Sequence, residues 1–123
     1  MHEFYMVSQL VEKVVEEAKK RDAKRVIEVE LEVGQLSFLN PEQMRFAYGV
    51  LSKGTILENS HLIITTIEAH VRCKACGFDG RPNYADDASY HVSAPLFLCP
   101  NCGSPVEVLE GKGCIVKRVR LEL

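Results

Sequence analysis

The sequence lacks three features, each of which would point to a particular class of protein. It has no run of about 18 apolar residues, so it contains no predicted membrane-spanning helix. Its net charge is −2, unlike the strongly basic chains that attract nucleic acid. Its first residues lack the basic stretch and apolar core of a signal peptide. We therefore expect a cytoplasmic protein that binds neither membranes nor nucleic acids.

The sequence also lacks the motifs of common enzymes. It has no glycine-rich phosphate loop, and no nucleophile is spaced to pair with a general base. The length of 123 residues allows one domain with a small insert. A content of 46% hydrophobic and 26% charged residues is typical of a globular protein. We therefore do not expect an enzyme.

Two cysteine pairs stand out among the residues that are present. Cys73 and Cys76 are three residues apart, as are Cys99 and Cys102, and a glycine follows each pair directly. A tight turn aims both sulfurs of a pair at one point, and two such turns supply the four thiolates of a closed tetrahedral Zn²⁺ site. Because four thiolates saturate zinc and leave no position for a substrate, we interpret this site as structural and not catalytic.

The segment between the cysteine pairs is long and acidic. The interval is 22 residues, slightly above the usual zinc-ribbon interval of about 15–20 residues. Its glycine, proline, asparagine, aspartate and serine residues predict a loop over residues 78–98. Between residues 71 and 110 there are three basic and five acidic side chains, which is a poor electrostatic match for nucleic acid.

The first third of the chain predicts a helix followed by a strand. Apolar residues recur at three- and four-residue steps over residues 3–21, which is the pattern of an amphipathic helix. Over residues 27–33, apolar side chains alternate with Glu28, Glu30 and Glu32, which predicts a strand with a solvated glutamate face.

A second helix is predicted to begin at Asn40, the N-cap, with Pro41 in the first helical position. Gly54 is a natural residue for its C-terminal end. Its apolar stripe is expected to contain Met44, Phe46, Ala47, Val50 and Leu51.

Two further strands complete the expected core. Residues 62–71 predict one strand, and residues 115–123 predict the last, with Ile115 on its apolar face and Lys117 breaking that face. We therefore predict an α+β fold in which two helices pack on a three-stranded sheet, with an inserted four-cysteine zinc-ribbon-like module. Residues 1–70 and 112–123 would form the core, and residues 71–111 the module.

The chain start offers a second metal site. The α-amine of Met1, the backbone nitrogen of His2 and its Nδ1 can bind one ion through a five-membered and a six-membered ring. Because the amide nitrogen must lose its proton, this chelate favours planar nitrogen coordination of Ni²⁺ or Cu²⁺. One planar position is left for an exchangeable ligand or for one of four side chains: Glu3, His61, His70 and His91.

Taken together, these features resemble the HypA/HybF family of nickel metallochaperones in [NiFe]-hydrogenase maturation. The resemblance covers essentially the whole chain and rests on the order of several short segments. These are Met1-His2-Glu3, Ala23-Lys24-Arg25-Val26, Val33-Gly34-Gln35-Leu36, Phe46, Gly54-Thr55-Ile56, the two cysteine pairs and Gly111-Lys112-Gly113. The interval between the cysteine pairs is longer here than in most members of the family.

The resemblance implies Ni²⁺ as cargo at the chain start, bound by His2 with Glu3 assisting, and structural Zn²⁺ at the four cysteines. His91, the only histidine in the insert, would be an extra nickel ligand. The implied partners are a HypB-like maturation GTPase and the hydrogenase large-subunit precursor, and the chain could form a homo-oligomer.

Other classes of protein stay open at this point. One alternative is a zinc-ribbon module that binds nucleic acid or protein and transfers no nickel. Another is a rubredoxin-like electron carrier, because Cys99-Pro100-Asn101-Cys102-Gly103 is similar to an iron-binding knuckle. A colourless protein loaded with zinc would exclude the electron carrier.

Overall fold

The chain is represented by a computed structural model that describes residues 2–87, 92–96 and 98–123, and only the backbone within residues 83–97. It divides into two compact units, which we treat separately. Unit 1 consists of Met1–Val33, Phe38–Thr65 and Cys114–Leu123, and unit 2 of Gly34–Ser37 and Thr66–Gly113.

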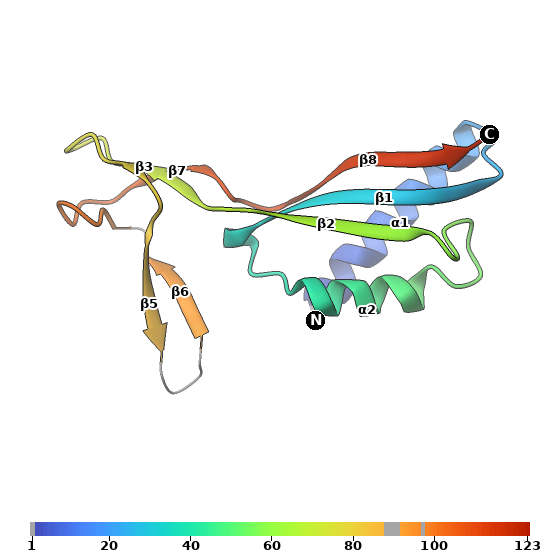
Figure 1. Cartoon of the computed structure of the whole chain (residues 1–123), viewed down its shortest axis with the longest axis horizontal. Helices are drawn as coiled ribbons and strands as arrows, with labels where there is room; N and C mark the ends of the chain where they lie inside the picture. Colours follow the sequence, from blue (N-terminus) through green and yellow to red (C-terminus); the bar gives the residue numbers. More distant parts are fainter. Residues whose placement is uncertain (1, 88–91, 97) are drawn as a thin grey trace. The chain divides into compact units, whose positions relative to one another are not determined.

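Unit 1 contains two helices and one three-stranded sheet. The helices are α1 (His2–Lys20) and α2 (Pro41–Leu51), and the strands are β1 (Arg25–Gly34), β2 (His61–Ile67) and β8 (Cys114–Glu122). The sheet has the order β2-β1-β8, with β1 and β8 antiparallel. Both helices cover the same face of the sheet (Figure 1). The predicted α+β fold is therefore confirmed.

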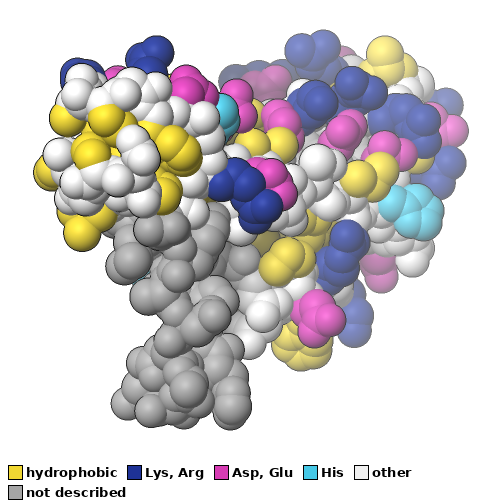
Figure 2. Space-filling view, turned by 60° about the vertical axis from the view of Figure 1, so that its left-hand side comes forward, with side chains coloured by type: hydrophobic (Ala, Val, Ile, Leu, Met, Phe, Trp, Pro, Cys, Tyr) yellow, Lys and Arg dark blue, Asp and Glu magenta, His cyan; other side chains and the backbone are white. Residues whose placement is uncertain are grey.

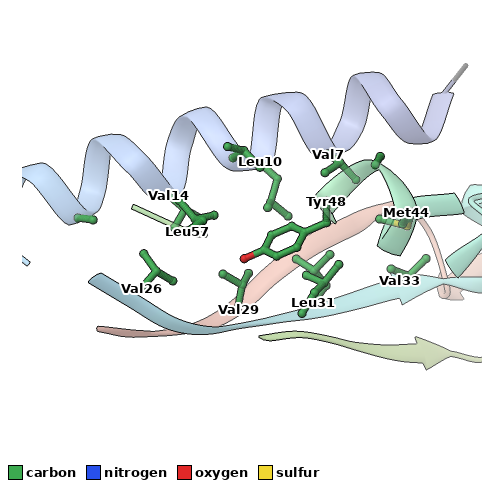
Figure 3. Packing of buried hydrophobic residues seen from close by; sticks show 14 residues of the cluster. Val7, Leu10, Val14, Val26, Val29, Leu31, Val33, Met44, Tyr48 and Leu57 are labelled. Carbon is green, nitrogen blue, oxygen red and sulfur yellow. The ribbon is translucent and has the colours of Figure 1, made fainter. Parts of the chain in front are cut away.

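The core of unit 1 lies between this sheet face and the helices (Figure 3). The periodic residues of α1 that are buried in it are Val7, Leu10, Val11, Val14 and Ala18. They meet alternate residues of β1, where Val29 and Leu31 are fully buried. Each large aliphatic side chain buried in this way contributes about 1.5–3 kcal/mol, so hydrophobic contact holds α1 on the sheet.

The predicted apolar stripe of α2 is partly wrong. Phe46 is 70% exposed and Val50 is 45% exposed, whereas Tyr48 is buried. In a helix with 3.6 residues per turn, positions 44, 47, 48 and 51 share one face, and positions 46 and 50 turn away from it. The helix also ends before Gly54, because Ser52 is its C-cap. Gly54 lies in the following turn with a φ of +75°.

A β-bulge in β8 changes which of its side chains face the core. Glu30 pairs with Arg118 while the next residue, Leu31, pairs with Val116, so Lys117 is the extra residue. Because a one-residue insertion reverses which side chains face the core, Ile115 is 59% exposed, contrary to the prediction.

The glutamates of β1 alternate with its buried residues as predicted, but they are only partly exposed, because arginines of β8 lie beside them. Glu28 and Arg120 form an ion pair of 3.2 Å, and Glu30 and Arg118 one of 3.8 Å. The three glutamates of this strand therefore form no separate acidic site, because two of them face arginines across the sheet.

Unit 2 is built from short strands. A 3₁₀ turn, η1 (Gln35–Ser37), precedes a sheet of order β4-β3-β7, formed by β3 (His70–Arg72), β4 (Asp79–Gly80) and β7 (Glu107–Glu110). A separate antiparallel ribbon consists of β5 (Asn83–Asp87) and β6 (Val92–Leu96).

Two predictions fail in unit 2. The strand expected over residues 62–71 is divided into β2 and β3. Between them, the backbone N–H of Ala69 donates to the side-chain Oε1 of Gln35 at 2.9 Å and not to a neighbouring strand. The loop expected over residues 78–98 contains β4, β5 and β6 instead. The hydrogen bonds that pair β5 with β6 join backbone groups, so polar side chains do not prevent this pairing.

Three backbone segments of unit 2 pack against one another at glycines. The N–H of Gly34 donates to the carbonyl of Gly113 at 2.7 Å, and that of Leu36 to the carbonyl of Gly111 at 2.8 Å. A Cβ at Gly34 would lie 2.2 Å from the Gly111 oxygen, and one at Gly111 would lie 2.7 Å from Cα of Ala69. Only glycine fits these two positions.

Candidate metal centre

The four predicted zinc ligands meet in unit 2. Their sulfur atoms all lie within 4.8 Å of one another. Sγ of Cys73 is 3.6 Å from Sγ of Cys102, and Sγ of Cys76 is 3.5 Å from Sγ of Cys99. A tetrahedral ion with Zn–S bonds of about 2.3 Å requires sulfur–sulfur distances of about 3.8 Å. The donor set therefore fits Zn²⁺.

Each cysteine pair is held in a turn of the same design. The N–H of Gly77 donates to the carbonyl of Cys73, and the N–H of Gly103 donates to the carbonyl of Cys99, both at 2.9 Å. The two glycines have φ values of +80° and +79°, which glycine adopts without a Cβ penalty. The two turns thus present their sulfurs in equivalent ways.

The cage is buried on one side and open on the other. Cys73 and Cys99, the first cysteine of each pair, are only 1% and 4% exposed. Cys76 and Cys102, the second of each pair, are exposed to solvent. An incoming ligand or competing metal would therefore reach a bound ion past Cys76 and Cys102.

Hydrogen-bond donors around the cage favour the thiolate form on its open side. The side-chain hydroxyl and the backbone N–H of Ser104 lower the pKa of Cys102 to about 6. The side chain of Asn101 lowers the pKa of Cys76. For Cys73 the backbone N–H of Cys76 acts in the same direction, but burial and the neighbouring sulfurs outweigh it and raise the pKa to about 11. A bound cation adds its own charge and keeps all four sulfurs deprotonated.

At the chain start, His2 is the first residue of α1 and its side chain is exposed. Oε2 of Glu3 accepts a hydrogen bond from the backbone N–H of Asn40 at 3.1 Å. The N–H groups of Glu3 itself and of Asn40 lower the pKa of the Glu3 carboxyl. Met1 lies outside the described residues.

The other candidate histidines are placed differently. His61 is exposed at the start of β2 in unit 1. His70, in unit 2, is bound through its Nε2 to the carboxylate of Asp79. His91 lies outside the described residues. Within the described part of the chain, the four cysteines form the only cluster of three or more residues that could hold a metal ion.

The surface and the helices add two observations. Acidic and basic side chains are interspersed over the face shown in Figure 2, where no purely basic area is visible. Among the described residues, no helix combines the length and the apolar character that crossing a bilayer requires.

Fold and site together define a small α+β protein with a four-cysteine metal module. Comparison with known proteins shows the family to which it belongs. The family model described as "Hydrogenase/urease nickel incorporation, metallochaperone, hypA" matches residues 1–121. The chain belongs to the HypA family, which is a family of metallochaperones and not of enzymes.

Individual relatives agree with the family model. The chain is 40% identical over 123 residues to the hydrogenase maturation factor HypA of Methanothermobacter thermautotrophicus, covering 99% of this chain and 98% of the relative. It is 36% identical over 134 residues to the HypA of Methanopyrus kandleri, covering 100% and 94% of the two chains.

Solved structures show the same fold. The solution structure of the Ni metallochaperone HypA from Helicobacter pylori is similar with a TM-score of 0.63 and 20% identity, covering 98% of this chain and 97% of that one. A second solution structure of a HypA protein gives a TM-score of 0.67 and 23% identity, covering 98% and 96%.

Proposed function

We propose that this protein binds Ni²⁺ at its chain start and delivers it during [NiFe]-hydrogenase maturation. Membership of a nickel-incorporation family supports the cargo. The names of the relatives, hydrogenase maturation factors, support the destination. The observation that carries the proposal is the position of His2, which is exposed at the first residue of α1.

That position leaves the amide nitrogen of His2 without a helical hydrogen bond to give up. The first four N–H groups of an α-helix have no acceptor within the helix, and the N–H of His2 is one of them. A metal ion that binds this nitrogen can therefore displace its proton to solvent without breaking a helical hydrogen bond. The Met1 amine, this nitrogen and Nδ1 of His2 would surround the ion in a plane, as Ni²⁺ prefers.

Glu3 would assist from a fixed position. Its carboxylate is held by the N–H of Asn40, so a negative charge stays next to the nickel ligands. A negative charge at this point also suits the positive end of the α1 dipole. The Glu3 carboxylate would thus attract the cation from a position that it already occupies in the metal-free protein.

A site at the chain end suits transfer. Its ligands can be replaced one at a time by those of an acceptor, because no element of unit 1 needs to open first. The partners that fit this role are a HypB-like GTPase and the hydrogenase large-subunit precursor, met in the cytoplasm.

We assign the two metals to different parts of the chain. Residues 1–70 and 112–123 would form the nickel-binding core, and residues 71–111 the zinc-binding module. In that module Cys73, Cys76, Cys99 and Cys102 would hold Zn²⁺ as a structural ion, because a cage of four cysteines with two buried sulfurs leaves no open ligand position. His91, which lies outside the described residues, stays a predicted extra ligand of nickel and not of zinc.

Calorimetric titration with Ni²⁺ tests the nickel site on the zinc-loaded protein. His2→Ala should weaken nickel binding by at least tenfold, and so should two uncleaved residues added before Met1, because each removes a chelate ligand. Glu12→Gln, which changes an exposed side chain of α1 away from the chain start, should bind as the wild type does. Unchanged affinity in the extended protein would refute the proposal.

A further inference from the structure

The two turns of the metal cage differ at both positions between their cysteines, and the second of these positions matters here. Ala75 precedes the second cysteine of the first turn, and Asn101 occupies the equivalent position in the second turn. The side chain of Asn101 does not remain within its own turn. Its Nδ2 donates to Sγ of Cys76, in the other turn, at 3.6 Å.

Asn101 also donates within its own turn. Its backbone N–H lies 3.3 Å from Sγ of Cys99, which accepts a second N–H, that of Cys102, at 3.4 Å. Asn101 therefore contacts one sulfur of each turn. Cys99 is buried and has two backbone donors, whereas Cys76 is exposed and receives the amide of Asn101.

We propose that Asn101 is a positioning residue that holds Cys76 on the metal and limits the rate at which zinc leaves the open side of the cage. The inference rests on the proposed zinc at the four cysteines. A thiolate that dissociates from the ion must first leave its ligand position, and the hydrogen bond from Asn101 keeps Cys76 there. Outer donors of this kind commonly affect metal affinity by about 10–100-fold.

Ala75 shows that the turn itself does not need asparagine. The first turn forms the same Gly77-to-Cys73 hydrogen bond as the second turn forms between Gly103 and Cys99, both at 2.9 Å, with alanine in this position. Asn101→Ala should consequently leave the backbone of the turn intact and remove only the contact with Cys76.

The test is the rate of zinc transfer from the full-length protein to an excess of a chromogenic chelator. Asn101→Ala and Asn101→Leu should both release zinc roughly tenfold faster than the wild type. The leucine variant retains the bulk of the side chain without its donor, so it separates hydrogen bonding from shielding. Lys74→Ala is the control, because this exposed side chain of the first turn pairs with Glu107 at 3.8 Å.

The outcomes are distinguishable. Wild-type release rates in both Asn101 variants, or in the leucine variant alone, would overturn the role of the hydrogen bond. If Lys74→Ala releases zinc as fast as the Asn101 variants, the faster release cannot be attributed to the contact between Asn101 and Cys76, and the inference fails. Zinc content is measured first by atomic emission. A wild-type protein purified without zinc would overturn both the zinc assignment and the inference about Asn101. A variant purified without zinc is reloaded, and weaker zinc affinity than the wild type supports the inference.

Discussion

The carboxylate of Glu3 accepts a hydrogen bond from the backbone N–H of Asn40 at 3.1 Å. Asn40 is also the N-cap of α2, where its Oδ1 accepts from the N–H groups of Glu42 and Gln43 at 2.9 and 3.1 Å. Asn40 thus forms hydrogen bonds at the start of α1, with Glu3, and at the start of α2, with Glu42 and Gln43. The proposed nickel ligands occupy a chain end whose third residue is anchored.

This contact predicts a pH dependence. Because the Glu3 pKa is lowered below 4.5 in the folded protein, the ionised carboxylate stabilises the fold above its ordinary pKa. That contribution disappears as the pH falls through the lowered pKa. Glu3→Gln should reduce the free energy of unfolding at neutral pH by only about 0.5 kcal/mol, since the pair is solvent-accessible.

Two measurements check this prediction. In an NMR titration, the Glu3 carboxyl should have a midpoint below 4.5, and the Asn40 amide should shift with the same midpoint. Glu12→Gln, on the exposed face of α1, serves as the stability control. A midpoint at or above the ordinary value would show that the hydrogen bond does not form in solution.

Gly111 and Gly113 should respond differently to alanine. Both have positive φ values, +97° and +67°, which cost a residue with a Cβ about 1–2 kcal/mol. At Gly113 the new Cβ would meet nothing within 4 Å, but at Gly111 it would lie 2.7 Å from the backbone of Ala69. Gly111→Ala should therefore destabilise by more than about 3 kcal/mol and Gly113→Ala by much less. Equal losses in urea unfolding would contradict the close packing.

The four thiols should differ in reactivity in the metal-free protein. The thiolate is the nucleophilic form, and Cys102 is exposed with a pKa of about 6, whereas Cys73 is buried with a pKa of about 11. At neutral pH iodoacetamide should label Cys102 first and Cys73 last, as followed by peptide mass spectrometry. Ser104→Ala should slow the labelling of Cys102, because the hydroxyl is the main cause of its low pKa. Labelling of Cys73 as fast as Cys102 would be inconsistent with this structure.

Local patterns predicted most of the fold. Helix α1, strand β1, the N-cap Asn40 and the metal cage were each predictable, because a short stretch of sequence contains the whole signal: a periodicity, a cap or a ligand spacing. The observed ends of α1 and β1 lie within one or two residues of the predicted ends.

The features that could not be predicted depend on residues far apart in the sequence. The bulge at Lys117 is a property of the pairing between β1 and β8, and it alone determines that Ile115 is exposed. The break at Ala69 depends on Gln35 and on Gly111. The role of Asn101 depends on a sulfur in the other turn, although an asparagine between paired cysteines was a visible clue.

The central claim is that nickel is bound by nitrogen at the chain start and not by the cysteines. Nickel X-ray absorption on the zinc-loaded protein with one equivalent of Ni²⁺ tests it most directly. We predict nitrogen and oxygen ligands in a planar arrangement, including the imidazole of His2, and the loss of that imidazole signal in His2→Ala. Sulfur ligands around nickel, with the spectrum unchanged in His2→Ala, would contradict the claim.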